Sequence, residues 1–230
     1  MPQRFAIYYA PSMSDPLWDR SSVWLGRDPA TGELFEGTVA GIERTRLLNL
    51  TQSASRYGFH ATIKPPMALA AGATLEDLQG ALTEFAKNAQ PVELGHLRLA
   101  DLDGFLALVP TEENNPALQD FAAHVVESFE PLRAPLSPRD FAARLAKGLT
   151  PRQEELLEAY GYPYVFDEFR FHMTLTDRLG EDDREDLKSA AQTWFGPALE
   201  EPVTLDRLVL FSEGESGNLF VRLGEYRLGQ

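Results

Sequence analysis

The sequence predicts an α+β fold of two pseudo-symmetric lobes that share a central cleft. The segment 59–63 (FHATI) recurs as the segment 171–175 (FHMTL), so each copy holds a histidine and a threonine two residues apart. Each copy begins the same expected order of elements, namely strand, helix, strand and strand. We interpret this order as an internal duplication, which predicts two related antiparallel sheets flanked by helices.

Capping, periodicity and turn residues mark the elements after the first motif. A helix is expected from about Thr74 to Asn88, because Thr74 is a favourable N-cap residue with Asp77 three positions on. Two strands are expected over 92–100 and 105–110, joined by an Asp-Gly turn.

The second half repeats this order. A helix with acidic residues in its first turn is expected over about 182–195, and two strands follow over 203–211 and 219–228, joined across the turn 214–217. The period is far too long for a solenoid. We therefore expect one domain over 1–230, in which lobe one covers about 50–111 and lobe two about 165–230.

A helical insert over about 114–160 belongs to neither repeat. Helices are expected over about 116–130, over 139–147 and from Thr150, where Pro151 takes the favoured first position and Glu154 completes a weak capping box. The insert carries a basic cluster, which is either a solvated surface paired with nearby acids or a set of cations reaching over the cleft to a second phosphate. Its members are Arg133, Arg139, Arg144, Lys147 and Arg152.

The N-terminal part begins with a short expected strand over 5–10, which follows Arg4 at once, so no signal peptide is expected. The segment 12–48 has no strong period. It either forms a lid at one end of the cleft or packs on the edge of the core through Trp18 and Trp24.

Composition limits the class of protein. Among 230 residues, 21 are basic and 35 acidic, which gives a formal net charge of −14 without an evident basic stripe. Such a surface repels a nucleic-acid backbone, so we expect a small phosphorylated substrate instead of a nucleic acid. The absence of cysteine excludes disulfides and thiolate metal sites and fits a cytoplasmic protein. No apolar run approaches the roughly 20 residues that span a bilayer, so we expect no membrane partner, and we expect a monomer.

The repeated motif supplies groups suited to acid–base chemistry. In a β-strand successive side chains point to opposite faces, so His60 and Thr62 share one face, and so do His172 and Thr174. Two such strands side by side bring two imidazoles, which titrate near neutrality, next to two hydroxyl donors. We expect these four residues to be the catalytic set for a phosphate ester.

Strand alternation and aromatic character also mark candidate substrate-binding residues around the motifs. They are Arg56, Tyr57, Lys64, Tyr164, Arg170 and Thr176. For Lys64, a surface lysine whose charge reaches solvent is an equal alternative. Glu168 shares the parity of His172 and leaves a metal site open, although such sites typically need a further protein ligand. We expect no metal and no other cofactor.

The paired His-x-Thr motifs and their flanking strings carry a family resemblance. The chain resembles the two-histidine (2H) phosphoesterase superfamily, and the strings 56–66 (RYGFHATIKPP) and 169–176 (FRFHMTLT) are similar to an uncharacterised branch linked to phosphonate metabolism. The strings 8–11 (YYAP) and 161–164 (GYPY) extend the similarity over most of the chain. The resemblance implies a bilobal fold with the motif histidines on central strands that face one cleft.

The resemblance also implies a metal-independent phosphodiesterase acting on a small cyclic phosphate of a ribose or nucleotide. One histidine would activate water or a ribose hydroxyl, the other would protonate the leaving oxygen, and the threonines would hold the non-bridging oxygens. Two alternatives stay open. An RNA end-processing or 2′–5′ ligase-type enzyme is opposed by the acidic charge, and a non-catalytic phosphometabolite-binding protein by the intact histidine and threonine of both motifs.

Overall fold

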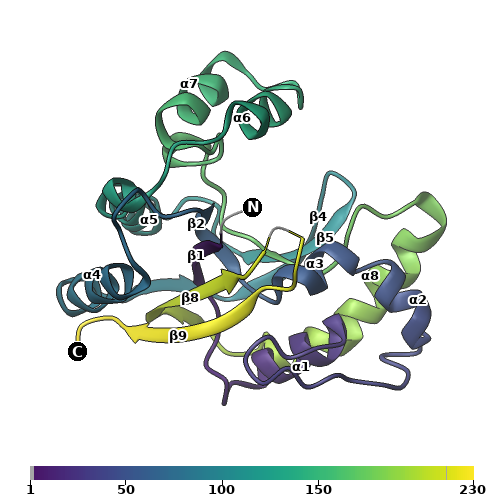
Figure 1. Ribbon diagram of the computed structural model, residues 1–230. Helices are drawn as coiled ribbons and strands as arrows, with labels where there is room; N and C mark the ends of the chain where they lie inside the picture. The colour runs from purple at the N-terminus through teal and green to yellow at the C-terminus, as the bar shows by residue number, and fades with distance from the viewer. Residues whose placement is uncertain (1–2, 216) are drawn as a thin grey trace.

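A seven-stranded antiparallel sheet with helices packed around it dominates the computed structural model, which describes residues 3–215 and 217–230 (Figure 1). Its strand order is β4-β5-β6-β2-β1-β8-β9, and β3 and β7 form a second, two-stranded sheet. The strands are β1 (Arg4–Tyr9), β2 (Ala61–Met67), β3 (Val92–Gly95), β4 (Leu97–Leu102), β5 (Phe105–Pro110), β6 (Met173–Thr174), β7 (Val203–Leu205), β8 (Arg207–Glu213) and β9 (Val221–Arg227).

Helices lie where they are expected after each motif and in the insert, and the described part of the chain before β2 adds three that the sequence analysis does not predict. They are α1 (Pro16–Leu25), α2 (Arg44–Asn49), α3 (Gln52–Tyr57), α4 (Leu75–Asn88), α5 (Pro116–Ser128), α6 (Pro138–Leu145), α7 (Pro151–Tyr160) and α8 (Glu181–Phe195), with short 3₁₀ turns at Glu130–Leu132, Phe166–Glu168 and Gly196–Ala198. The α+β fold class predicted from the sequence is confirmed.

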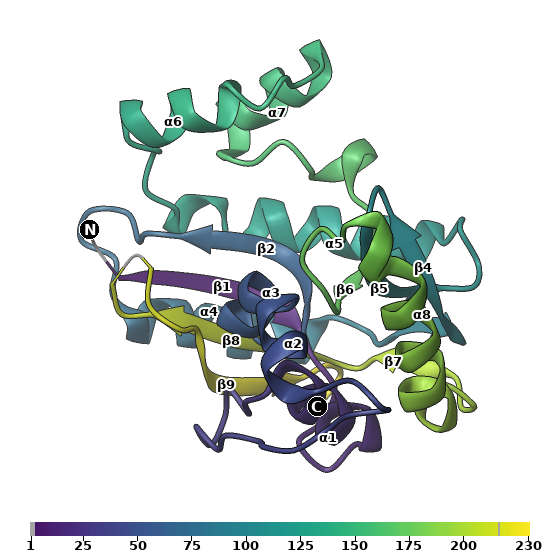
Figure 2. The ribbon, with the colours of Figure 1, turned by 90° about the vertical axis from the view of Figure 1, so that its right-hand side faces the viewer.

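The two halves exchange their hairpins across the sheet. The hairpin β4-β5 follows the first motif in the chain but pairs with β6, the strand of the second motif. The hairpin β8-β9 follows the second motif but pairs with β1, next to β2 (Figure 2). The expectation of two separate sheets is therefore corrected to one continuous sheet with both motif strands at its centre.

The two faces of the sheet differ. On one face, side chains such as Ile7, Ile63 and Leu210 join the main hydrophobic core together with residues of α4, α5 and α8. On the other face, Tyr8 and Phe211 belong to a smaller apolar cluster. The main core therefore covers only one face of the sheet, and on the other face a small apolar cluster leaves space for polar side chains.

The motif strands meet at one central pair. Ala61 of β2 lies opposite Met173 of β6 in antiparallel register, and both side chains are buried on the core side. In this register the residues on either side of the pair project from the opposite face of the sheet. The histidine and threonine of both motifs therefore emerge together on the face away from the main core.

A β-bulge places Lys64 on the core face. Tyr8 of β1 lies opposite Thr62, but the next residue, Ile7, lies opposite Lys64, so β2 holds one extra residue at this point. The Lys64 ammonium is buried and donates to the Glu130 carboxylate and the Val126 carbonyl, both at 2.9 Å. The expectation that Lys64 shares the face of His60 is wrong, because the extra residue of the bulge interrupts the alternation of side chains along β2.

Other boundaries differ locally from the expectations. The strand expected over 92–100 is divided into β3 and β4, and the strand expected over 203–211 is divided into β7 and β8. In each case the first piece leaves the large sheet, and the two first pieces, β3 and β7, pair with each other in the small sheet. Thr74 and Asp77 form the expected capping box. At α7 the partner of Thr150 is Gln153 instead of Glu154. Within the expected turn 214–217, position 216 lies outside the described residues.

The segment 12–48 contributes to the core and not to a lid. It contains α1 and α2, and the indole rings of Trp18 and Trp24 are buried. Trp24 donates a hydrogen bond to the carbonyl of Leu175 at 3.0 Å, directly behind the second motif. Every helix of the described chain is too short or too polar to cross a membrane.

Removing Glu130 should cost more stability than removing Lys64. In Glu130→Leu the Lys64 ammonium, only 2% exposed, keeps a single carbonyl as acceptor, and leaving a buried charge unpaired costs about 3–5 kcal/mol. In Lys64→Met the Glu130 carboxylate stays paired with Arg133 and partly exposed, so the loss should stay below about 1.5 kcal/mol. Urea unfolding of both variants measures the difference, and equal losses would contradict this account of the pair.

Candidate functional site

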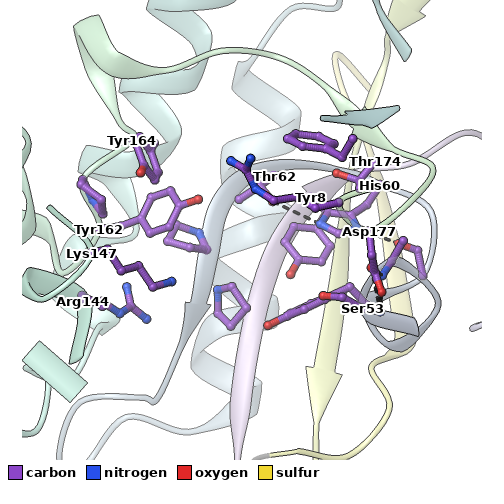
Figure 3. Close-up of a pocket in the computed structure, with 18 of the residues that line it drawn as sticks. Tyr8, Ser53, His60, Thr62, Arg144, Lys147, Tyr162, Tyr164, Thr174 and Asp177 are labelled. Carbon is purple, nitrogen blue, oxygen red and sulfur yellow. Dashed lines mark hydrogen bonds between the residues drawn. The ribbon is translucent and has the colours of Figure 1, made fainter. Parts of the chain in front are cut away.

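A cleft of about 510 Å³ lies between the second face of the sheet and the helical insert (Figure 3). Its size is in the range of small-molecule sites, about 300–1,000 Å³. Side chains from the sheet, from the end of α3 and from the insert border it. Those with polar or aromatic groups include Arg4, Tyr8, Tyr57, His60, Thr62, Arg144, Lys147, Tyr162, Tyr164, Thr174, Thr176 and Asp177.

The register at the centre of the sheet arranges the two motifs as cross-strand pairs. Because Ala61 lies opposite Met173, His60 faces Thr174 and Thr62 faces His172. Directly opposed residues have Cβ atoms about 4.5–5.5 Å apart and diagonal ones about 7–8 Å. The two imidazoles are thus diagonal neighbours, with one hydroxyl beside each. His60 and both threonines border the cleft, whereas His172, which lies opposite Thr62, is not among the residues that border it.

Both histidines make the same local hydrogen bond. Nδ1 of His60 lies 2.8 Å from the carbonyl oxygen of Gly58, and Nδ1 of His172 lies 2.8 Å from the carbonyl oxygen of Arg170. A carbonyl oxygen only accepts, so each Nδ1 carries a proton and donates it. Nε2 of each ring is therefore the atom that can exchange a proton in the cleft. Nε2 of His60 lies 3.1 Å from Oγ1 of Thr62.

His60 sits among aromatic rings. The Tyr8 ring stacks on its imidazole with centroids 3.7 Å apart and 19° between planes, and the Tyr57 and Phe211 rings lie at 6.2 and 6.3 Å. The pKa of His60 is lowered to about 4, mainly by desolvation. The hydrogen bond to the Gly58 carbonyl opposes this shift, and the nearby charge of His172 adds to it. His60 is consequently a neutral imidazole at neutral pH.

Tyr8 is a site residue that the sequence analysis did not single out. Its side chain is fully buried, and burial raises the pKa of its phenol well above the usual value. Its hydroxyl has no hydrogen-bond partner within the described residues. Alternation along the expected strand over 5–10 could have indicated it, had the pairing of that strand with the first motif been foreseen.

Three of the six expected substrate-binding residues border the cleft. Tyr57 and Tyr164 present their rings to it, and Thr176 lies on its floor, where its Oγ1 accepts a hydrogen bond from the Leu106 amide at 2.9 Å. Thr176 therefore also fixes the pairing of β5 with the second motif.

The other three expected residues point elsewhere. Lys64 is buried in its ion pair with Glu130. Arg56 lies in the last turn of α3 instead of extending β2, and its guanidinium pairs with the buried Glu213 carboxylate. Arg170 precedes β6 in a segment without strand pairing, and it donates to the carbonyls of Asp167 and Phe169. Neither arginine is among the residues that border the cleft, so both expectations are corrected on geometric grounds.

The basic cluster of the insert is divided between the two interpretations left open above. Arg133 and Arg152 pair with acids, Arg133 with Glu130 and Arg152 with Asp167. Arg144 and Lys147 instead border the cleft, on the side opposite His60 (Figure 3).

The part of the chain that the structure describes holds no group of three or more His, Cys, Asp and Glu side chains placed to bind a metal ion. Glu168, the carboxylate with the parity of a third ligand, accepts a hydrogen bond from the Gln153 amide at 2.9 Å. It therefore serves the packing of α7 against the segment before the second motif.

Comparison with known proteins finds a family and relatives. A family model described as "Protein of unknown function (DUF1045)" matches residues 62–221. A protein named "Ribose 1,5-bisphosphate phosphokinase PhnN" from Janthinobacterium sp. (strain Marseille) is 37% identical over 225 residues, covering 95% of this chain and 49% of that protein. Its namesake from Laribacter hongkongensis (strain HLHK9) is 35% identical over 221 residues, covering 94% and 50%. The chain thus spans about half the length of the curated relatives it matches.

Solved structures show weaker likeness. "Crystal structure of E.coli LigT complexed with 3'-AMP" matches with a TM-score of 0.42 and 12% identity, and "Crystal structure of phosphoesterase" with 0.41 and 12%, each over 100% of both chains. At these values the likeness carries no weight for the chemistry of the cleft.

His60 should titrate far below an ordinary histidine. In an NMR titration of the imidazole signals, its midpoint should lie near pH 4, because burial against Tyr8 opposes the charged form. His172→Ala should move the midpoint upward, since a neighbouring positive charge is removed. The exposed His96 provides an internal reference. A His60 midpoint near 6.5 in the folded protein would contradict this description of its environment.

Proposed function

The chain belongs to the DUF1045 family, and we propose that its cleft is the active site of a metal-independent phosphodiesterase of the 2H type that opens a small cyclic phosphate ester. The observation that carries the proposal is the arrangement of two His–Thr pairs on one face of the sheet, each with Nδ1 tied to a carbonyl and Nε2 left for proton transfer. Two such imidazoles can act on opposite sides of one phosphorus atom.

The proposed step uses His60 as base and His172 as acid. The neutral Nε2 of His60 takes a proton from water as the water oxygen attacks phosphorus, which forms the new P–O bond. The bond to the leaving sugar oxygen breaks, and Nε2–H of His172 protonates that oxygen, so the product is a phosphomonoester with a free hydroxyl. The environment that keeps His60 neutral supports its part in this assignment. In the reverse direction the two roles exchange.

The threonines suit the charge that develops on phosphorus. The hydroxyls of Thr62 and Thr174 lie beside the two imidazoles and can donate to the non-bridging oxygens. Unlike Lys64, which is buried in an ion pair, they are available on the cleft face.

The substrate that we favour is a cyclic phosphate of a ribose. The net charge of −14 favours a small substrate over RNA. The curated relatives carry a name that refers to a ribose bisphosphate, and hydrolysis of a ribosyl cyclic phosphate yields a ribosyl phosphomonoester. The chain has no Gly-rich loop of the form GxxxxGK[ST], so we do not extend the kinase activity in that name to it. We further propose a cytoplasmic monomer with a role in phosphonate metabolism, as the resemblance implies.

Removing either motif histidine should nearly abolish turnover of a ribose cyclic phosphate. His60→Ala and His172→Ala should each lower kcat by about 10²–10⁴-fold, the usual contribution of a positioned acid or base. The double variant should lose little more than either single one, because the two groups act as a unit. His96→Ala removes an exposed histidine away from the cleft and is the matched control. Near-wild-type rates in either motif variant would refute the mechanism.

Turnover should survive chelation and fall at low pH. With EDTA present the rate should be unchanged, and kcat/KM should drop as the pH approaches about 4, since the base His60 becomes protonated there. Steady-state rates between pH 3.5 and 9, with folding checked at each end by circular dichroism, provide the measurement. Loss of activity on chelation would replace this mechanism by a metal-dependent one.

A further inference from the structure

The end of the cleft away from the histidines is formed by the insert and is positively charged. Arg144 at the end of α6 and Lys147 just after it border the cleft, together with the rings of Tyr162 and Tyr164 from the segment after α7 (Figure 3). In the figure these four side chains stand together on the side opposite His60 and Thr174, with Tyr8 between the two groups.

The Arg144 guanidinium is held in place but not neutralised. One of its nitrogens donates to the Gly161 carbonyl, and the charge lies 5.9 Å from the centre of the Tyr162 ring. No carboxylate forms an ion pair with Arg144 or Lys147 anywhere in residues 3–215 and 217–230. Among the basic residues that border the cleft, Arg178 also lacks an ion pair in the described part of the chain, but it donates to the Asp103 carbonyl.

The backbone that accepts the hydrogen bond from Arg144 is itself held by close contacts. Gly161 ends α7 with a φ of 69°, a conformation that L side chains rarely adopt, and a Cβ there would lie 2.7 Å from an Arg133 nitrogen. Arg133 in turn is fixed by Glu130 and by the carbonyl of Ala159. These contacts fix the backbone at Gly161, and the hydrogen bond from Arg144 to the Gly161 carbonyl in turn fixes the guanidinium.

Partial burial also affects the charge of the Arg144 guanidinium. Desolvation is the largest cause that lowers the pKa of Arg144 from its usual value, and the charge of Arg4 acts in the same direction, whereas Tyr162, Asp140 and Tyr57 oppose them. An anion bound beside Arg144 would offset the desolvation and the repulsion from Arg4. Of the remaining basic groups at the cleft, Arg4 is paired with Glu213, and Arg178 donates to the Asp103 carbonyl.

We propose that Arg144 and Lys147 form a second anion subsite, so that the substrate is a cyclic phosphate ester of a sugar that carries a separate phosphomonoester. This inference rests on the proposed function, because it deepens the substrate class of the same cleft. The histidine end takes the cyclic phosphodiester, and the insert end takes the phosphomonoester, whose geometry suits a guanidinium fork and an ammonium. The insert thereby selects among cyclic phosphates.

A matched pair of substrates tests the subsite. Adenosine 2′,3′-cyclic phosphate and its 5′-phosphorylated form differ only in the second phosphate. The wild-type protein should have a higher kcat/KM for the 5′-phosphorylated compound, and Arg144→Ala should lower that value roughly 10- to 100-fold through KM, the scale of a lost charge-assisted contact. The value for the compound without the 5′-phosphate should stay unchanged. Lys147→Ala should act in the same direction.

Arg139→Ala is the control, since it removes an equal charge from the same helix at an exposed position away from the cleft. Equal kcat/KM for both compounds in the wild-type protein, or equal losses on both in Arg144→Ala, would overturn the subsite while leaving the hydrolase intact.

Calorimetric binding separates the subsite from the hydrolase. If neither compound is cleaved, the hydrolase proposal fails, and the subsite is judged by binding alone. The 5′-phosphorylated compound should then still bind the wild-type protein more tightly, and Arg144→Ala should remove the difference. Equal binding of both compounds would overturn the inference in this case too.

Discussion

The antiparallel pairing of Ala61 with Met173 is the constraint on which the site depends. A shift of β6 by one residue in this register would turn His172 and Thr174 toward the core and leave His60 alone on the cleft face. β6 is only two residues long, so its position is fixed mainly by neighbours: β5 pairs with it on the other side, and the Leu106 amide donates to Thr176 just beyond it. Because β5 belongs to the first half of the chain, each half positions the motif of the other.

Charge is distributed unevenly around this centre. The chain is acidic as a whole, yet among the described residues the cleft is bordered by the imidazole of His60 and by four basic side chains against the single carboxylate of Asp177. The basic residues are Arg4, Arg144, Lys147 and Arg178. An acidic exterior repels long polyanions, whereas a short anion inside the cleft meets mainly local cations. The acidic exterior and the cationic cleft are therefore compatible, and both favour a small substrate.

The central arrangement could be predicted from the sequence because it depends on a repeated string and on alternation along short strands. His60, Thr62 and Thr174 border the cleft as expected. Prediction failed at Lys64, where a bulge reverses the alternation that sequence counting assumes, and at Arg56, where a helix ends instead of a strand continuing.

The exchange of hairpins could not be foreseen from the order of elements alone, because the same order is compatible with each hairpin staying in its own half. The position of the insert relative to the sheet could not be predicted from the sequence either. Whether Arg144 reaches the cleft depends on where α6 and α7 lie relative to the sheet, which helical periodicity within the insert does not determine (Figure 2).

The duplication also explains how two identical motifs acquire different chemistry. Both histidines share the hydrogen bond from Nδ1 to the carbonyl two residues before, so the repeat gives them one tautomer. Across the pseudo-twofold axis, Tyr8 opposite Thr62 corresponds to Ala107 opposite Thr174. A methyl group cannot stack on an imidazole, so the aromatic cover that helps to desolvate His60 has no counterpart at that position. Acid and base in one cleft need environments that separate their proton affinities. Here Tyr8 stacks on His60 at 3.7 Å, whereas Phe105 lies tilted at 5.9 Å from His172, so the repeat places its two identical motifs in different surroundings.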